Sequence, residues 1–118
     1  MAAIFWASAQ SDPPMPSGVS DKLLHALAYF GLCVLVFRAV AGRFPARVTW
    51  RRAAAALAIT IGYAATDELH QMAVPGRAAE ALDLIADAFG ALLALIGGWA
   101  WGILRTFRAQ SPAPTRDV

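Results

Sequence analysis

Polar side chains that could bind a ligand or transfer a proton gather in three short stretches of this sequence. They are DKLLHALAY at residues 21–29, TDELHQ at residues 66–71 and DLIAD at residues 83–87. Residues four apart lie on one side of a helix. A helical chain would therefore present three polar stripes, formed by Asp21, His25 and Tyr29, by Asp67 and Gln71, and by Asp83 and Asp87.

These residue types suit proton transfer, and we leave open whether the protein is an enzyme. His25 could carry a proton, because a histidine titrates near physiological pH, or it could be a hydrogen-bonded interior residue. With Tyr29 and Glu68 it could also supply general acid or base chemistry. No serine or cysteine stands in a recognised nucleophile context, so a hydrolase would depend on this cluster alone. His70 is expected to face solvent at a helix end.

A metal site is the alternative for the carboxylates. Glu68, Asp83 and Asp87 with His25 offer ligands that suit several divalent cations, but their spacing matches no established metal motif. We expect an internal salt-bridge network with Lys22 and Arg77 instead, and no metal or cofactor. Arg77 could also hold an anionic headgroup through bidentate hydrogen bonds, although a salt bridge is the preferred interpretation.

The elements that carry these residues are predicted to be membrane helices. The chain has 118 residues, enough for one domain, of which 58% are hydrophobic and 15% charged, against about 25% charged in soluble domains. A bilayer core needs about 20 apolar residues for each helical span. The sequence therefore predicts an all-α fold, a small transmembrane helical bundle with full spans at 21–41, 50–72 and 80–105.

The other segments are shorter. Residues 1–10 would rise only about 15 Å as a helix, so we interpret them as a partial first helix, a truncated span or an interfacial segment. Residues 11–20 form a Pro-rich external loop, 42–49 a basic cytoplasmic loop and 73–79 an external turn. The tail, 106–118, is expected to be cytoplasmic, with residues 109–118 disordered.

Charge sets the predicted orientation. Basic residues concentrate at one side of the spans, namely Arg38, Arg43, Arg47, Arg51, Arg52, Arg105, Arg108 and Arg116. By the positive-inside rule this side and the carboxyl terminus are cytoplasmic. Carboxylates within a membrane cost about 2.5–3.5 kcal/mol each at its centre, so they face a bundle interior or water. We therefore expect a polar pocket that opens toward the outer side.

A second pattern predicts how the last span packs. Gly90, Ala94, Gly98 and Gly102 recur every four residues. Such a stripe of small residues lets two membrane helices approach closely.

The polar stretches carry a family resemblance. DKLLHALAYFGL and YAATDELHQMAVPGRAAEALDLIADAFGALL together resemble the VanZ-like family of small bacterial membrane proteins. The residues that match the family pattern are Asp21, Lys22, His25, Tyr29, Glu68, Gln71, Pro75, Arg77, Asp83 and Gly90. Asp87 stands where the family usually has Asn, which adds a negative charge and removes an amide donor.

The resemblance implies a multi-pass protein of the bacterial inner membrane that acts in the cell envelope. It suggests teicoplanin tolerance, a form of antibiotic resistance, and a lipid-linked or amphipathic molecule, an envelope lipid or a glycopeptide-related ligand, as partner beside the membrane lipids. Two alternatives are a proton-coupled transporter or its subunit, and a structural partner in a membrane assembly. Nucleic acid is not expected, because the basic residues do not cluster with aromatic ones. The oligomeric state stays open.

Overall fold

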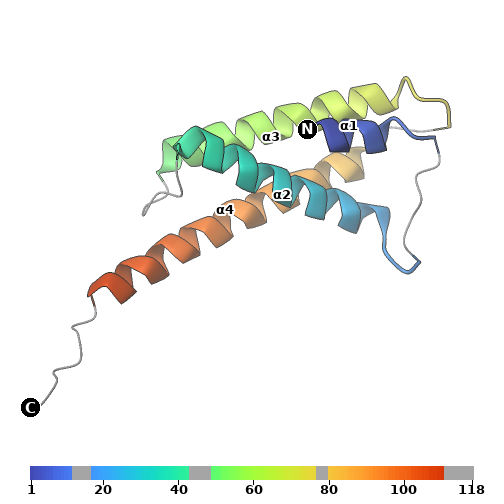
Figure 1. Ribbon diagram of the computed structural model, residues 1–118. Coiled ribbons are helices and arrows are strands. Elements are labelled where there is room, and N and C mark those ends of the chain that lie inside the picture. Colours follow the sequence, from blue (N-terminus) through green and yellow to red (C-terminus); the bar gives the residue numbers. More distant parts are fainter. Residues whose placement is uncertain (12–16, 43–48, 77–79, 111–118) are drawn as a thin grey trace, which may run out of the picture.

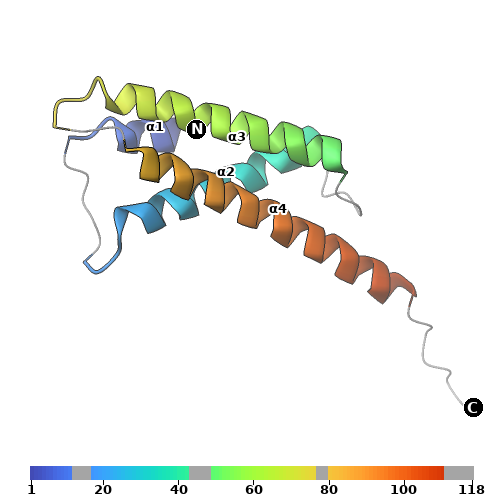
Figure 2. The same ribbon diagram turned by 180° about the vertical axis from the view of Figure 1, so that it is seen from behind.

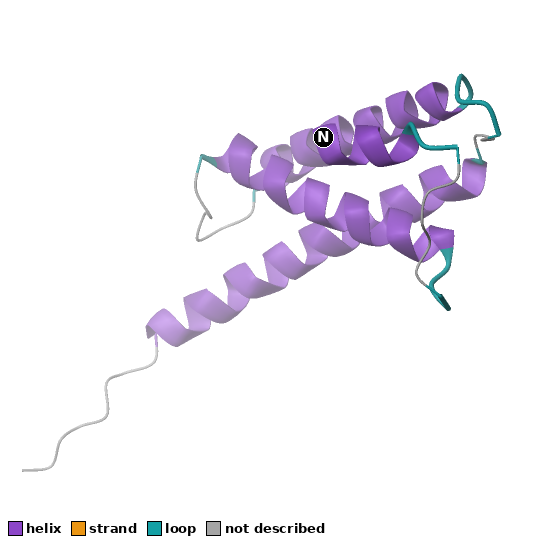
Figure 3. Ribbon diagram, turned by 45° about the vertical axis from the view of Figure 1, so that its right-hand side comes forward, coloured by secondary structure: helices purple, strands orange, loops and turns teal. Residues whose placement is uncertain are grey.

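The computed structural model describes residues 1–11, 17–42, 49–76 and 80–110. These residues form four helices and no strand (Figures 1 and 3). The helices are α1 (Ala2–Ser8), α2 (Asp21–Ala41), α3 (Trp50–Gln71) and α4 (Ala81–Gln110). The predicted all-α fold, with three long helices after a short first one, is confirmed.

Local sequence explains where α2 begins and ends. The Ser20 side chain accepts a hydrogen bond from the Leu23 backbone N–H at 3.2 Å, which caps the first turn. Gly42 follows the last turn with a φ of 72°, a left-handed conformation that glycine adopts without steric cost. The first polar stripe therefore starts at the very beginning of a helix.

Helix α4 is longer than predicted. It continues to Gln110, whereas the sequence interpretation ended the span at residue 105 and expected disorder from residue 109. The residues after Leu104 include neither proline nor glycine, so nothing in them interrupts the helical hydrogen bonds before Pro112. Residues 111–118 lie outside the described residues, as do 12–16, 43–48 and 77–79 of the predicted loops.

Helices α2 and α4 cross and both contact α3, while α1 lies along α3 (Figures 1 and 2). Two apolar clusters hold the bundle together. Tyr29 and Leu32 of α2 pack with Ala64 of α3. Cys33 of α2 packs with Ala91 and Ala94 of α4.

The helix crossing depends on Gly90. A Cβ atom at this position would lie 2.0 Å from the Ala26 backbone oxygen of α2, so only glycine fits. Ala94, one turn further, is buried in the same contact. A Cβ at Gly98 would meet open space, because α4 diverges from α2 there (Figure 1). Within the described structure, Gly90 and Ala94 of the predicted small-residue stripe thus contact α2.

Two helices are long and apolar enough to cross a membrane, Asp21–Ala41 and Ala81–Leu104. Large apolar side chains on both are exposed, including Leu27, Leu35, Phe89 and Ile96, as expected for surfaces that face lipid. Helix α3 is not among them, although its 22 residues would rise about 33 Å. Arg51 and Arg52 near its start and Asp67 and Glu68 near its end lower its hydropathy, and its role as a span stays a prediction.

Candidate functional site

The predicted polar residues meet at one end of the bundle. This end contains the first turns of α2 and α4, the last turns of α3 and the end of α1 (Figures 1 and 3). The members that the structure brings together there are Asp21, Lys22, His25, Tyr29, Asp67, Glu68, Gln71, Asp83 and Asp87. Arg77 lies outside the described residues, so its predicted salt bridge or headgroup contact stays a prediction.

Lys22 ties the start of α2 to the start of α4. Its Nζ donates to Glu80 Oε2 at 2.5 Å and also to Asp83 Oδ1. The Asp83 side chain is only 4% exposed, so this ion pair balances a buried carboxylate. Glu80, which the sequence interpretation did not include in the cluster, is the second acceptor for Lys22, and its side chain is mostly exposed.

His25 stands among three carboxylates. Its Nδ1 lies 2.9 Å from Asp87 Oδ1, and its Nε2 lies 4.0 Å from Asp21 Oδ2 and from Asp83 Oδ2. The side chain is 10% exposed. This position allows His25 to pass a proton between carboxylates or to hold the start of α2 against α4, the two alternatives that its sequence context left open.

Asp67 is held by α1. It is 3% exposed and accepts a hydrogen bond from Ser8 Oγ at 2.6 Å, and Gln71 Nε2 lies 3.5 Å from its other oxygen. Sequence reasoning missed Ser8, because a serine in a short apolar segment carries no pattern. Only the fold of α1 against α3 shows that it belongs to the site.

Glu68 uses one of its two oxygens. Oε2 accepts a hydrogen bond at 3.1 Å from the backbone N–H of Glu80, just before α4 begins. Its other oxygen, Oε1, is buried and has no hydrogen-bond partner in the described part of the protein. The same holds for Asp87 Oδ2 and the Tyr29 hydroxyl. Buried polar atoms are nearly always paired, so this group calls for a physical explanation.

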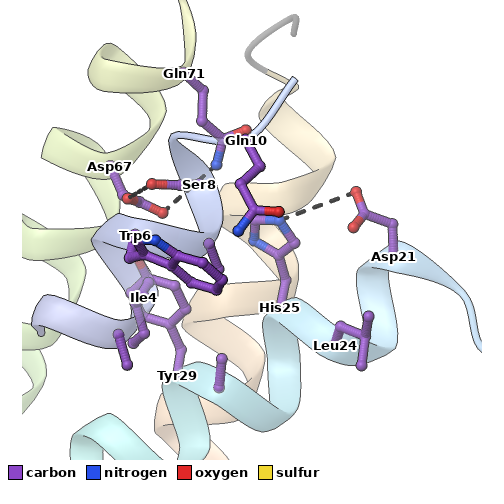
Figure 4. Close-up of a pocket in the computed structure, with 13 residues that line it drawn as sticks. Ile4, Trp6, Ser8, Gln10, Asp21, Leu24, His25, Tyr29, Asp67 and Gln71 are labelled. Atoms are coloured by element: carbon purple, nitrogen blue, oxygen red, sulfur yellow. Dashed lines mark hydrogen bonds and ion pairs between the residues drawn. The ribbon is translucent and has the colours of Figure 1, made fainter. Parts of the chain in front are cut away.

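A cavity of about 400 Å³ opens beside this cluster (Figure 4). Its polar lining comes from α2 and α3 and from the end of α1: Ser8, Gln10, Asp21, His25, Tyr29, Asp67 and Gln71. Its apolar lining comes from α1 and α2: Ala3, Ile4, Trp6, Ala7, Leu24 and Ala28. Lys22, Glu68, Asp83 and Asp87 are not part of this lining, so the predicted pocket divides into a cavity wall and a group behind it.

The structure corrects the expectation for His70. This residue was predicted to face solvent, but its ring stacks on Phe5 of α1 with ring centroids 4.2 Å apart. Its Nε2 is buried without a hydrogen-bond partner in the described structure. Helix α1 covers this end of α3, which the sequence of α3 alone could not indicate.

Two helices that could cross a membrane, with a buried polar cluster and a cavity at one end of the bundle, are typical of a helical membrane protein. The chain belongs to the VanZ/LLP1 family, whose model matches residues 3–104. The resemblance noted in the sequence is thereby confirmed. No curated protein and no solved structure matches the chain.

Proposed function

We propose that this protein binds the polar headgroup of a lipid-linked or other amphipathic molecule of the cell envelope in the cavity beside His25. The observation that carries the proposal is the division of the cavity wall. Ile4, Trp6 and Leu24 offer an apolar surface, while Asp67 and Gln71 offer buried hydrogen-bonding groups next to it. A molecule with a hydrocarbon part and a polar part satisfies both.

The size of the cavity favours a membrane component over an antibiotic. Small-molecule sites have volumes of about 300–1,000 Å³, and this cavity, at about 400 Å³, lies near the lower limit. A headgroup and the first carbons of a chain fit this space, whereas a glycopeptide antibiotic is far larger. Tolerance to teicoplanin, as the family suggests, would then arise through a lipid-linked envelope component that this protein binds.

The polar lining favours a ligand rich in hydrogen-bond donors. Asp21 and Asp67 contribute carboxylates, which only accept hydrogen bonds, and Gln71 contributes an amide that does both. Hydroxyl groups of a saccharide, or an amine, match these acceptors.

We further propose that the cavity lies at the outer side of the bacterial inner membrane. The cluster of carboxylates and Arg51 and Arg52 stand at opposite ends of α3. The positive-inside rule places the arginine end in the cytoplasm, together with the end of α4. Three crossings, by α2, α3 and α4, are consistent with this arrangement.

Teicoplanin susceptibility of cells that lack the gene tests this function. We expect deletion to increase susceptibility, the wild-type gene to restore tolerance and Asp67→Asn to fail, because the cavity loses a charged acceptor. Glu80→Gln is the matched control, since its carboxylate is exposed and outside the cavity, and it should restore tolerance. Equal membrane levels of both variants are required. Restoration by Asp67→Asn, or a deletion without effect, would count against the proposal.

A photo-crosslinking residue at Trp6 tests the ligand directly. We expect it to capture a defined lipid-linked species, identified by mass spectrometry of the adduct. The same residue at Trp99, an exposed position far along α4, should capture only bulk phospholipid. Identical adducts at both positions would show that the cavity selects nothing.

A proton-coupled transporter is the second candidate, favoured by the contacts of His25 with three carboxylates. A relay requires polar groups through the whole membrane. In the described part of α3, the buried polar side chain outside the cluster is Thr60. Its hydroxyl donates to the Ala56 carbonyl oxygen of the same helix and therefore does not extend a relay across the membrane. Proton flux into liposomes that depends on Asp83 would favour transport.

A structural role in a membrane assembly is the remaining alternative, and tolerance of substitutions throughout the cluster would favour it.

A further inference from the structure

Three side chains from three helices converge behind the cavity wall. His25 of α2, Glu68 of α3 and Asp87 of α4 each offer one ligand atom, and these atoms lie within 4.8 Å of one another. When a metal ion binds nitrogen and oxygen atoms at about 2.0–2.2 Å, two neighbouring ligand atoms lie roughly 3 Å from each other. His25 Nδ1 and Asp87 Oδ1 already stand 2.9 Å apart.

The unpaired oxygens of this group point to a ligand. Glu68 is 8% exposed and Asp87 is 1% exposed, yet Glu68 Oε1 and Asp87 Oδ2 have no hydrogen-bond partner in the described structure. A buried carboxylate oxygen without a partner is costly, because it has lost its water and gained nothing in return. We propose that His25, Glu68 and Asp87 bind a divalent cation between α2, α3 and α4.

A neighbouring trio is the weaker choice. Asp21, His25 and Asp83 also approach one another closely enough to share an ion. Asp83, however, already has a cation, because Lys22 Nζ donates to it. Glu68, by contrast, accepts a hydrogen bond from a backbone N–H, and Asp87 pairs with His25 itself. The sequence interpretation preferred a salt-bridge network with Lys22 and Arg77, and among the described residues Lys22 pairs with Glu80 and Asp83.

The surroundings of His25 would suit a metal-bound histidine. When Nδ1 binds the cation, Nε2 carries the hydrogen, and Nε2 faces the carboxylates of Asp21 and Asp83 at 4.0 Å. Carboxylates beside the second nitrogen fix the ring and increase its basicity in many metal sites. One imidazole and two carboxylates suit Zn²⁺ or Mn²⁺.

Mn²⁺ binding to the purified full chain in detergent tests the site without any lipid. The protein is first stripped with a chelator, and free Mn²⁺ is then counted from its six-line electron paramagnetic resonance spectrum. We expect one bound ion per chain. Glu68→Gln and Asp87→Asn should each weaken binding by at least about tenfold, the smaller effect seen even for residues that only support metal ligands. Glu80→Gln, the exposed carboxylate at the same end, should bind as the wild type does.

Pulsed spectroscopy of the bound Mn²⁺ adds a readout that folding alone would not change. We expect nitrogen modulation from an imidazole, lost in His25→Ala and kept in His70→Ala, the other histidine of the chain. Circular dichroism and elution as a single species show that each variant is folded. Absence of Mn²⁺ and Zn²⁺ binding, or binding unaffected by Glu68→Gln and Asp87→Asn, would overturn the proposal. The proposed function would then still stand on its own tests.

Discussion

At the scale of single residues, each buried carboxylate of this protein has its own means of compensation. Asp83 pairs with Lys22 and Asp67 accepts from Ser8, whereas Glu68 and Asp87 each keep one oxygen unpaired. Because charged groups in hydrocarbon surroundings are costly, these contacts also stabilise the end of the bundle that carries the site. The sequence contains these carboxylates, but their partners come from other helices.

Ser8→Ala tests the contact that holds α1. Removal of the hydroxyl leaves Asp67 without its 2.6 Å donor, so we expect a loss of about 1–3 kcal/mol in the free energy of unfolding. Thermal unfolding in detergent, followed by circular dichroism, measures it. Ser17→Ala, at an exposed position, is the control and should unfold like the wild type. An unchanged midpoint for Ser8→Ala would show that α1 does not depend on this bond.

At the scale of elements, the crossing of α2 and α4 positions His25 against Asp87. Gly90 permits this crossing because α2 approaches within the space that a side chain would need. Interiors are close-packed and do not absorb an extra methyl group without displacement. The two helices therefore hold the site through a contact one turn away from Asp87.

Gly90→Ala should push the two helices apart and lower the free energy of unfolding by about 1–3 kcal/mol. Gly98→Ala is the matched control, because its Cβ would enter open space in the same helix, and the gain in helix propensity is similar at both positions. Thermal unfolding of both variants measures the difference. Equal midpoints would mean that the crossing yields easily and that Gly90 is not needed for it.

At the scale of the whole molecule, the helices place every carboxylate cluster at one end and the arginines of α3 at the other.

Cysteine labelling of spheroplasts with a membrane-impermeant maleimide tests the proposed orientation. We expect Met72→Cys to react from outside and Trp50→Cys to react only after permeabilisation, since both positions are exposed. Native Cys33 is fully buried and should not react. The reverse pattern would place the cavity in the cytoplasm and contradict the envelope role.

The sequence alone determined the helices, the end at which polar residues gather and the family. Periodicity and apolar composition act along the chain, so DKLLHALAY and DLIAD predict helical stripes wherever the helices finally lie. Tertiary structure decided the rest. Ser8 and Trp6 join the site, and Phe5 stacks on His70, because α1 folds over α3; Asp87 meets His25 because Gly90 lets α4 approach α2. Contacts between segments so distant in the chain depend on packing, which no local pattern encodes.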